Sequence, residues 1–259
     1  MSNLLTIQDD VRDRIVATIA DVHGVLMQSM TQSLSVVATK DAPASELRLR
    51  YWRYQRQTGA AEHAQLRDTF EDIVAREPNR ATAWAALATL YCHETMFDYN
   101  TRPEALGRAK QAATRAIDLD AANQPAWEAL AVACFFAHDR DGFVDAAERA
   151  MALNPRNTNT LAWMGLLFTH LGEYDRGLAI VERAMTLNPH FPRWYHFAHF
   201  VAHYEHGEYG EALRAARRIN LPELLWSHWS VAIACGQPAA RTRHAPPSTP
   251  FSSWRASLR

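Results

Sequence analysis

The sequence predicts an all-α solenoid, a stack of helical hairpins. The main observation is an internal repeat: the segment 148–155, ERAMALNP, recurs at 182–189 as ERAMTLNP, so that Pro155 and Pro189 lie 34 residues apart. A two-helix unit of this length is too short to bury its own apolar face, so copies must stack and leave a concave surface free. A hydrophobic content of 48% and a net charge of -1 fit a soluble chain with a sizeable core.

The first 45 residues are predicted to form a helix, a short strand and a linker. Apolar residues at helical spacing follow Thr6, which suits a helix N-cap, and 24–27 has the composition of a strand. A lone strand needs a sheet to join. Residues 1–45 are therefore a candidate for the end of an upstream domain.

Residues 46–236 are predicted to form about five helix pairs and one extra helix. Trp84, Leu87, Ala88 and Tyr91 follow helical spacing and mark a first helix, and Pro103 suits the first position of its partner. The other first helices are expected near Trp52, Trp127, Leu161 and Tyr195, with second helices that include 66–78, 143–155, 177–189 and 209–219, and the extra helix at 223–235. The loop 94–102 adds nine residues to the period.

The last segment, 237–259, differs from the rest in composition. It contains four prolines, four arginines and no acidic residue. Such a composition cannot build a packed core, so a disordered tail is predicted. Two interpretations stay open: a flexible tail, or an out-of-frame remnant that replaces further repeats.

The spacing around Trp127 and Leu161 resembles tetratricopeptide repeats (TPR), and the match extends over about 46–236. The resemblance implies a groove lined by first-helix positions one, five, eight and nine beyond the repeat's aromatic position. These residues are Glu128, Val132, Phe135, Phe136, Ala162, Leu166, Thr169, His170, His196, Phe200, His203 and Tyr204. They include no Lys, Arg or Asn, which disfavours an acidic peptide. A protein with apolar or aromatic anchors, or a neighbouring domain, is the expected partner. The alternative is that neighbouring units cover some of these residues.

Four short segments, 7–11, 19–25, 98–104 and 192–195, resemble bacterial class III adenylate cyclases and winged-helix transcription activators in which TPR arrays follow an α/β domain. The resemblance implies an alternative function, the C-terminal regulatory arm of such a protein. The chain shows neither the acidic motifs of a cyclase catalytic domain nor a basic helix-turn-helix.

A stripe of histidines offers a second alternative, a metal-binding enzyme. His196, His199, His203 and His206 lie on one face of a predicted helix, and two histidines at i and i+4 can share a divalent metal. Three helical turns spread these side chains over roughly 15 Å, which favours a packed or groove-lining stripe. The same stripe gives the hypothesis that partner binding depends on pH.

Other features favour a non-catalytic scaffold without a cofactor in a cytoplasm, and the resemblance to cyclases and activators described above implies a bacterial one. There is no nucleophile elbow, no Gly-rich phosphate loop and no charge bias toward nucleic acid. Three separated cysteines, Cys92, Cys134 and Cys235, suggest a reducing compartment. No apolar run is long enough for a membrane span.

Overall fold

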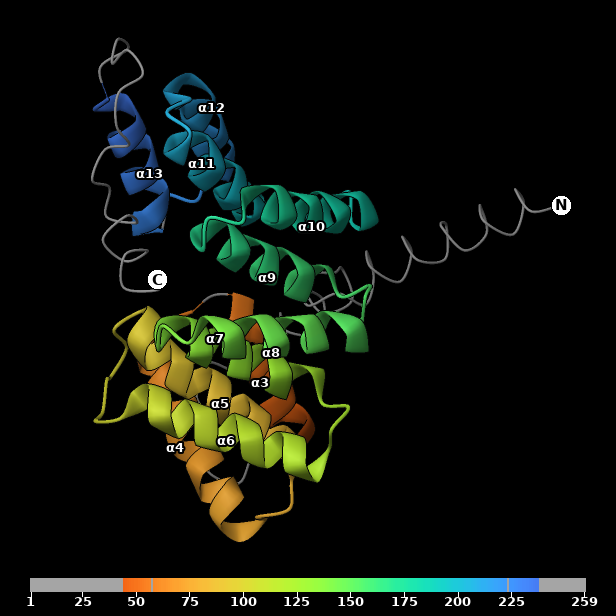
Figure 1. The fold of residues 1–259 in the computed structure, drawn as a ribbon. Helices are drawn as coiled ribbons and strands as arrows, with labels where there is room; N and C mark the ends of the chain where they lie inside the picture. The colour runs from red at the N-terminus through yellow and green to blue at the C-terminus, as the bar shows by residue number, and fades with distance from the viewer. Residues whose placement is uncertain (1–43, 57, 223, 238–259) are drawn as a thin grey trace, which may run out of the picture. The chain divides into compact units, whose positions relative to one another are not determined.

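The computed structural model describes residues 44–56, 58–222 and 224–237 (Figure 1). Within these ranges the chain forms eleven α-helices, α3–α13, and one 3-10 helix, η1, and no strand. It divides into two compact units between Pro155 and Arg156. We call the described residues up to Pro155 the N-terminal unit and those from Arg156 onward the C-terminal unit, and describe each by itself.

Three successive helix pairs make up the N-terminal unit. Their bounds are α3 (Ala44–Arg56), α4 (Ala60–Arg76), α5 (Ala81–Met96), α6 (Ala105–Leu119), α7 (Gln124–Phe136) and α8 (Arg140–Leu153). Helix α5 packs against its partner α6 and also against α7, the first helix of the next pair. Ala109, Ala113 and Ala116 of α6 are fully buried, and their small side chains let neighbouring helices approach closely. Consecutive hairpins therefore share one core, as a solenoid requires.

Side-chain caps and tryptophan hydrogen bonds fix where the first helices begin. Asn123 caps α7 by accepting a hydrogen bond from the backbone N–H three residues further along. The indole N–H groups of Trp84 and Trp127 each donate to a backbone carbonyl six residues earlier, at 3.0 Å. Both tryptophans are half-buried and tie their helix to the preceding turn.

The predicted start of α6 is wrong. The sequence predicts Pro103 at the first helical position, whereas α6 begins at Ala105 and Glu104 precedes it with a φ of 58°. Pro103 lies in the turn, where its carbonyl accepts a hydrogen bond from Arg108 Nε at 3.1 Å. The interactions of the inserted loop therefore override the preference of proline for the first helical turn.

Two helix pairs and one further helix make up the C-terminal unit. Their bounds are α9 (Thr158–His170), α10 (Tyr174–Leu187), η1 (Arg193–Tyr195), α11 (His196–Glu205), α12 (Tyr209–Ile219) and α13 (Leu225–Cys235). Helix α9 packs against α10 and α11, α11 against α12, and α12 against α13. The bounds of α12 are those predicted, whereas Tyr195 belongs to η1 and not to the helix that follows.

Glycines bring α9 and α10 together. A Cβ atom on Gly177 would lie 2.6 Å from the Gly165 carbonyl oxygen and 2.6 Å from Thr169 Cγ2. A Cβ atom on Gly165 would lie 2.7 Å from Val181 Cγ2. Only a residue without a side chain allows this approach, so the glycines set the separation of the two helices.

The turn that follows a first helix requires a positive φ. Gly172, after α9, has a φ of 85°, and Gly207, after α11, has a φ of 76°. His138 occupies this place after α7 with a φ of 59°. Because the left-handed region crowds a Cβ atom, His138 keeps the turn of the repeat at an energetic cost that glycine avoids.

The all-α solenoid class is confirmed by these hairpins. The predicted N-terminal helix and strand lie outside the described residues, as does the predicted tail except for Gln237. The single span 46–236 stays a prediction. Among the helices described, none combines the length and apolar character that crossing a bilayer demands.

Candidate functional site

On α7, the predicted groove residues differ in accessibility. Val132 is 5% exposed and Phe135 is 3% exposed, whereas Glu128 and Phe136 are half-buried. The Phe135 ring contacts the rings of Phe136 and Phe143 edge-on, with centroids 5.4 and 5.5 Å apart. Among these four positions, Phe136 is therefore the aromatic side chain that a partner could reach without unpacking the core.

The predicted groove residues of the C-terminal unit show the same division. Five of the eight are buried: Ala162, Leu166, Thr169, Phe200 and Tyr204. The other three are half-buried histidines: His170, His196 and His203. Such burial agrees with the alternative that neighbouring units cover some of these residues. The accessible part of this surface is thus polar and histidine-rich, and its aromatic rings lie below it.

The histidine stripe does not converge on one point. The His196 and His199 rings lie 5.9 Å apart, His199 Nε2 lies 3.6 Å from Glu182, and His203 Nδ1 lies 2.6 Å from Glu208. Among the residues described, no group of three or more His, Cys, Asp or Glu side chains is placed to hold a metal ion. The geometry therefore gives no support to the alternative of a metal-binding enzyme.

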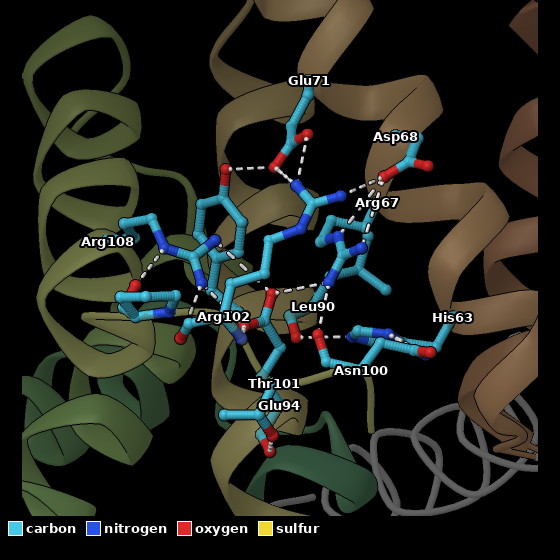
Figure 2. A network of polar contacts seen from close by, with 12 residues as sticks. His63, Arg67, Asp68, Glu71, Leu90, Glu94, Asn100, Thr101, Arg102 and Arg108 are labelled. Atoms are coloured by element: carbon cyan, nitrogen blue, oxygen red, sulfur yellow. Dashed lines mark hydrogen bonds and ion pairs between the residues drawn. The ribbon is translucent and has the colours of Figure 1, made fainter. Parts of the chain in front are cut away.

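A second polar centre, which the sequence did not reveal, lies beside the inserted loop between α5 and α6. Figure 2 shows arginines from α4, α6 and the loop gathered around Glu94, whose side chain has no exposed surface. Glu94 accepts hydrogen bonds from Arg67 Nη1 at 3.1 Å, Arg108 Nη2 at 2.6 Å and the Arg102 backbone N–H at 2.9 Å. Burial acts to raise the pKa of Glu94, but these three donors outweigh it and hold the pKa below its ordinary value.

Arg102 connects this centre to the surface of α4. Its guanidinium donates to both carboxylate oxygens of Glu71 at 3.1 Å and to Asp68 at 3.0 Å. The charges of the network balance, since Arg67, Arg102 and Arg108 face Asp68, Glu71 and Glu94 (Figure 2). Charge-assisted hydrogen bonds of this kind are strong, and this set fixes the loop in place.

His63 and Asn100 hold the other side of the loop (Figure 2). His63 Nε2 lies 2.9 Å from the Leu90 carbonyl oxygen, which can only accept, so this nitrogen carries the proton. His63 Nδ1 is then the acceptor for Asn100 Nδ2 at 3.3 Å, and Asn100 Nδ2 also donates to the Ala60 carbonyl at 2.7 Å. Burial lowers the pKa of His63, which keeps this neutral form.

A buried aromatic group lies next to the same loop. Tyr54 of α3 is fully buried, and its hydroxyl is hydrogen-bonded to His93 Nδ1 at 2.7 Å. Burial, helped by the nearby His63, lowers the pKa of His93 to about 3. In the loop, the Phe97 ring contacts the His93 ring of α5 with centroids 5.1 Å apart, and the Tyr99 ring contacts the His63 ring of α4 at 6.0 Å. The loop is therefore anchored by aromatic packing as well as by ion pairs.

The backbone of the loop is strained. Asp98, Asn100 and Glu104 have φ values of 54°, 51° and 58°. Such angles cost a non-glycine residue about 1–2 kcal/mol each. They persist because the surrounding contacts determine them, and strain of this kind is concentrated at recognition sites.

The buried cysteines do not suggest a nucleophile. Burial raises the pKa of the Cys92 and Cys134 thiols, and Cys92 Sγ donates to the Ala129 carbonyl at 3.5 Å. Thiols held in this way are protonated and unreactive at neutral pH.

No protein-family model matches the sequence, and no curated protein matches it. Among solved structures, the chain is similar to TTC0263, a TPR protein of Thermus thermophilus, with a TM-score of 0.58 and 17% identity over 73% of this chain and 96% of that one. The fold is that of TPR proteins. MamA (TM-score 0.46, 18% identity, 71% of this chain and 96% of that one) and a TPR protein of Parabacteroides merdae (0.49, 15%, 73% and 71%) are more distant in structure. At these identities the likeness concerns the fold alone.

Proposed function

We propose that this chain is a non-catalytic TPR scaffold that binds a partner protein through the accessible first-helix residues of its hairpins. The observation that carries the proposal is the packing of first helices within each unit, α5 against α7 and α9 against α11, which places the same first-helix positions side by side. A partner with apolar or aromatic anchors fits Phe136, the half-buried ring of this set. The chemistry described above, with protonated thiols and a closed ion network, supports the absence of catalysis.

The test compares two truncations of half-buried apolar side chains, one on each helix of the same hairpin. Phe136→Ala removes the half-buried ring from α7, whereas Met151→Ala removes a half-buried side chain from α8. Truncating an anchor residue costs about 2 kcal/mol or more in binding, a drop of at least 30-fold. Partner capture with tagged protein is expected to fail for Phe136→Ala and persist for Met151→Ala. Equal capture by both variants would remove the surface from consideration.

The buried rings are unsuitable for this test. Phe135, Phe200 and Tyr204 are 3% exposed or less, and truncating a buried aromatic residue costs about 3–5 kcal/mol of stability. Lost capture would then reflect unfolding. Circular dichroism must first show that the Phe136→Ala variant remains helical.

A regulatory arm is the second proposal. Two segments that resemble the cyclase and activator group, 98–104 and 192–195, coincide with the irregular parts of the described chain, the inserted loop and η1. Departures from a repeat at matched places are more specific than the repeat itself. The discriminating observation is the genomic sequence upstream of Met1: an in-frame catalytic or DNA-binding domain supports this proposal, and a stop codon directly upstream contradicts it.

A further inference from the structure

A patch of arginines and histidines lies on the C-terminal unit where η1, α11 and α12 meet. Helices α11 and α12 form a hairpin around the turn 206–208, so the last turn of α12 lies beside the first turn of α11. This arrangement brings Arg218 within electrostatic reach of His196 and His199, and Arg217 precedes it in the last turn of α12. Helix η1 packs against α12 and adds Arg193. We call these five residues the basic patch.

The arginines of the basic patch are exposed, and no carboxylate pairs with any of the three within the described part of the chain. Other arginines of the same unit behave differently, since Arg176 and Arg214 each pair with a glutamate three residues earlier. Glu182 of α10 is the carboxylate beside the patch, 3.6 Å from His199, and is itself 63% exposed. The patch therefore carries an excess of positive charge in a chain whose net charge is -1.

The pKa values of His196 and His199 reflect both burial and this excess of positive charge. Burial lowers the pKa of His196 to about 4, and His199, Arg218 and Arg193 add to the effect. Burial also lowers the pKa of His199, where His203 and Arg218 act in the same direction and Glu182 opposes them. His203 faces Glu208 at 2.6 Å. An anion placed among these groups would be attracted by Arg193 and Arg218 and would favour protonation of the histidines.

We propose that the basic patch binds an acidic segment of the partner protein. The proposal rests on the scaffold function above, because His196 belongs to both surfaces, and it adds the charge of the partner to the aromatic anchors. Charge complementarity selects this occupant, and each guanidinium can bind a carboxylate through two parallel hydrogen bonds. The aromatic side chains of Phe191 and Trp194 adjoin the patch, and the Phe191 ring contacts His196 at 5.5 Å.

This partner differs from the one the groove positions imply. Acidic peptides are disfavoured there because the twelve groove residues include no Lys, Arg or Asn. The cations of the basic patch come from η1 and from the second helix α12, which are not groove positions. Only the packing of η1 and α12 beside α11 puts them within reach of the same ligand.

The test uses a fluorescently labelled hexaglutamate peptide and the full chain, followed by anisotropy. Binding is expected to weaken by about 2- to 30-fold in the double variant Arg193→Ala/Arg218→Ala, because each exposed ion pair contributes about 0.2–1 kcal/mol. Binding should weaken as salt increases. Glu182→Gln, which removes the competing carboxylate, should strengthen it. Arg76→Ala, which removes an exposed arginine of α4, is the control and should leave the affinity unchanged. The four arginines of 237–259 are present in every variant, so any contribution they make to peptide binding is the same throughout.

A second measurement reports on the site itself. Histidine NMR titrations with and without hexaglutamate should show the pKa of His196 moving upward when the peptide binds. Hexaglutamate affinity that is the same in the double variant and the parent would overturn the proposal, as would equal or tighter binding of an oligothymidylate of equal charge. Either result leaves the Phe136→Ala capture test intact, so failure of this inference and failure of the scaffold function are distinguishable.

Discussion

Replacing Gly177 by alanine should separate α9 from α10. The added Cβ atom would lie 2.6 Å from the Gly165 carbonyl oxygen and 2.8 Å from the Thr169 backbone nitrogen, as well as against the Thr169 side chain. Backbone atoms of a packed helix cannot rotate away as a side chain can, so the helices themselves must move. Overpacking of this kind costs about 1–3 kcal/mol, while alanine regains about 0.5–1 kcal/mol from its lower backbone entropy in a helix. Taking the middle of each range, we expect a net loss of about 1 kcal/mol.

Gly210 supplies the matched control. It lies in α12 of the same unit, and a Cβ atom there meets nothing within 4 Å. Gly210→Ala should therefore stabilise the protein by about 0.5 kcal/mol. Urea unfolding followed by tryptophan fluorescence measures both changes, since Trp163 and Trp194 contact each other in this unit with ring centroids 5.9 Å apart. A Gly177→Ala protein as stable as the parent would refute the close-approach argument.

Three further predictions concern the N-terminal unit. Glu94→Gln should lower the free energy of unfolding by about 3 kcal/mol, because it leaves buried arginine charge uncompensated. Glu104→Gln, on the exposed part of the loop, is the control and should change it by less than about 0.5 kcal/mol. Urea titrations measure both changes. His138→Gly should raise the thermal midpoint, with a gain of about 0.5–1 kcal/mol from relief of the positive φ, and an unchanged midpoint would contradict the strain. The unfolded chain protonates His93 near pH 6.5 but the folded chain only near pH 3. The free energy of unfolding should therefore fall as pH drops through this window, by on the order of 3–5 kcal/mol. Chemical unfolding at several pH values measures this dependence, and His93→Gln should make it less steep.

The fold could be predicted from the sequence because the same local pattern recurs in several repeats. The segments 148–155 and 182–189 both end second helices, α8 and α10, at the residue before the Asn-Pro pair. Apolar spacing defines a helix face, and short connections define which helices are neighbours. These are local properties, so one chain carries the evidence for them.

The sequence was insufficient for the accessible surface. The positions counted from the repeat's aromatic residue identify a face of each first helix, yet Phe200 and Tyr204 on that face are 2% and 3% exposed while His203 is half-buried. Whether such a residue is covered depends on the helices packed around it. A pattern of residue types along one helix does not contain that information.

The polar centre around Glu94 could not be predicted either, because it joins residues that are distant in the sequence. Arg67 and Arg108 lie 27 and 14 residues from Glu94, and all three look like ordinary surface charges in the sequence. The one available signal was the break in period, which marked 94–102 as an insertion. An insertion in a solenoid must either extend into solvent or bond to its own hairpin, and here a fully buried carboxylate binds two arginines and the loop backbone. The bonds to Glu94 offset the backbone strain of the three residues with positive φ. Glu94→Gln weakens these bonds, so it tests what holds the loop as well as the ion pairs.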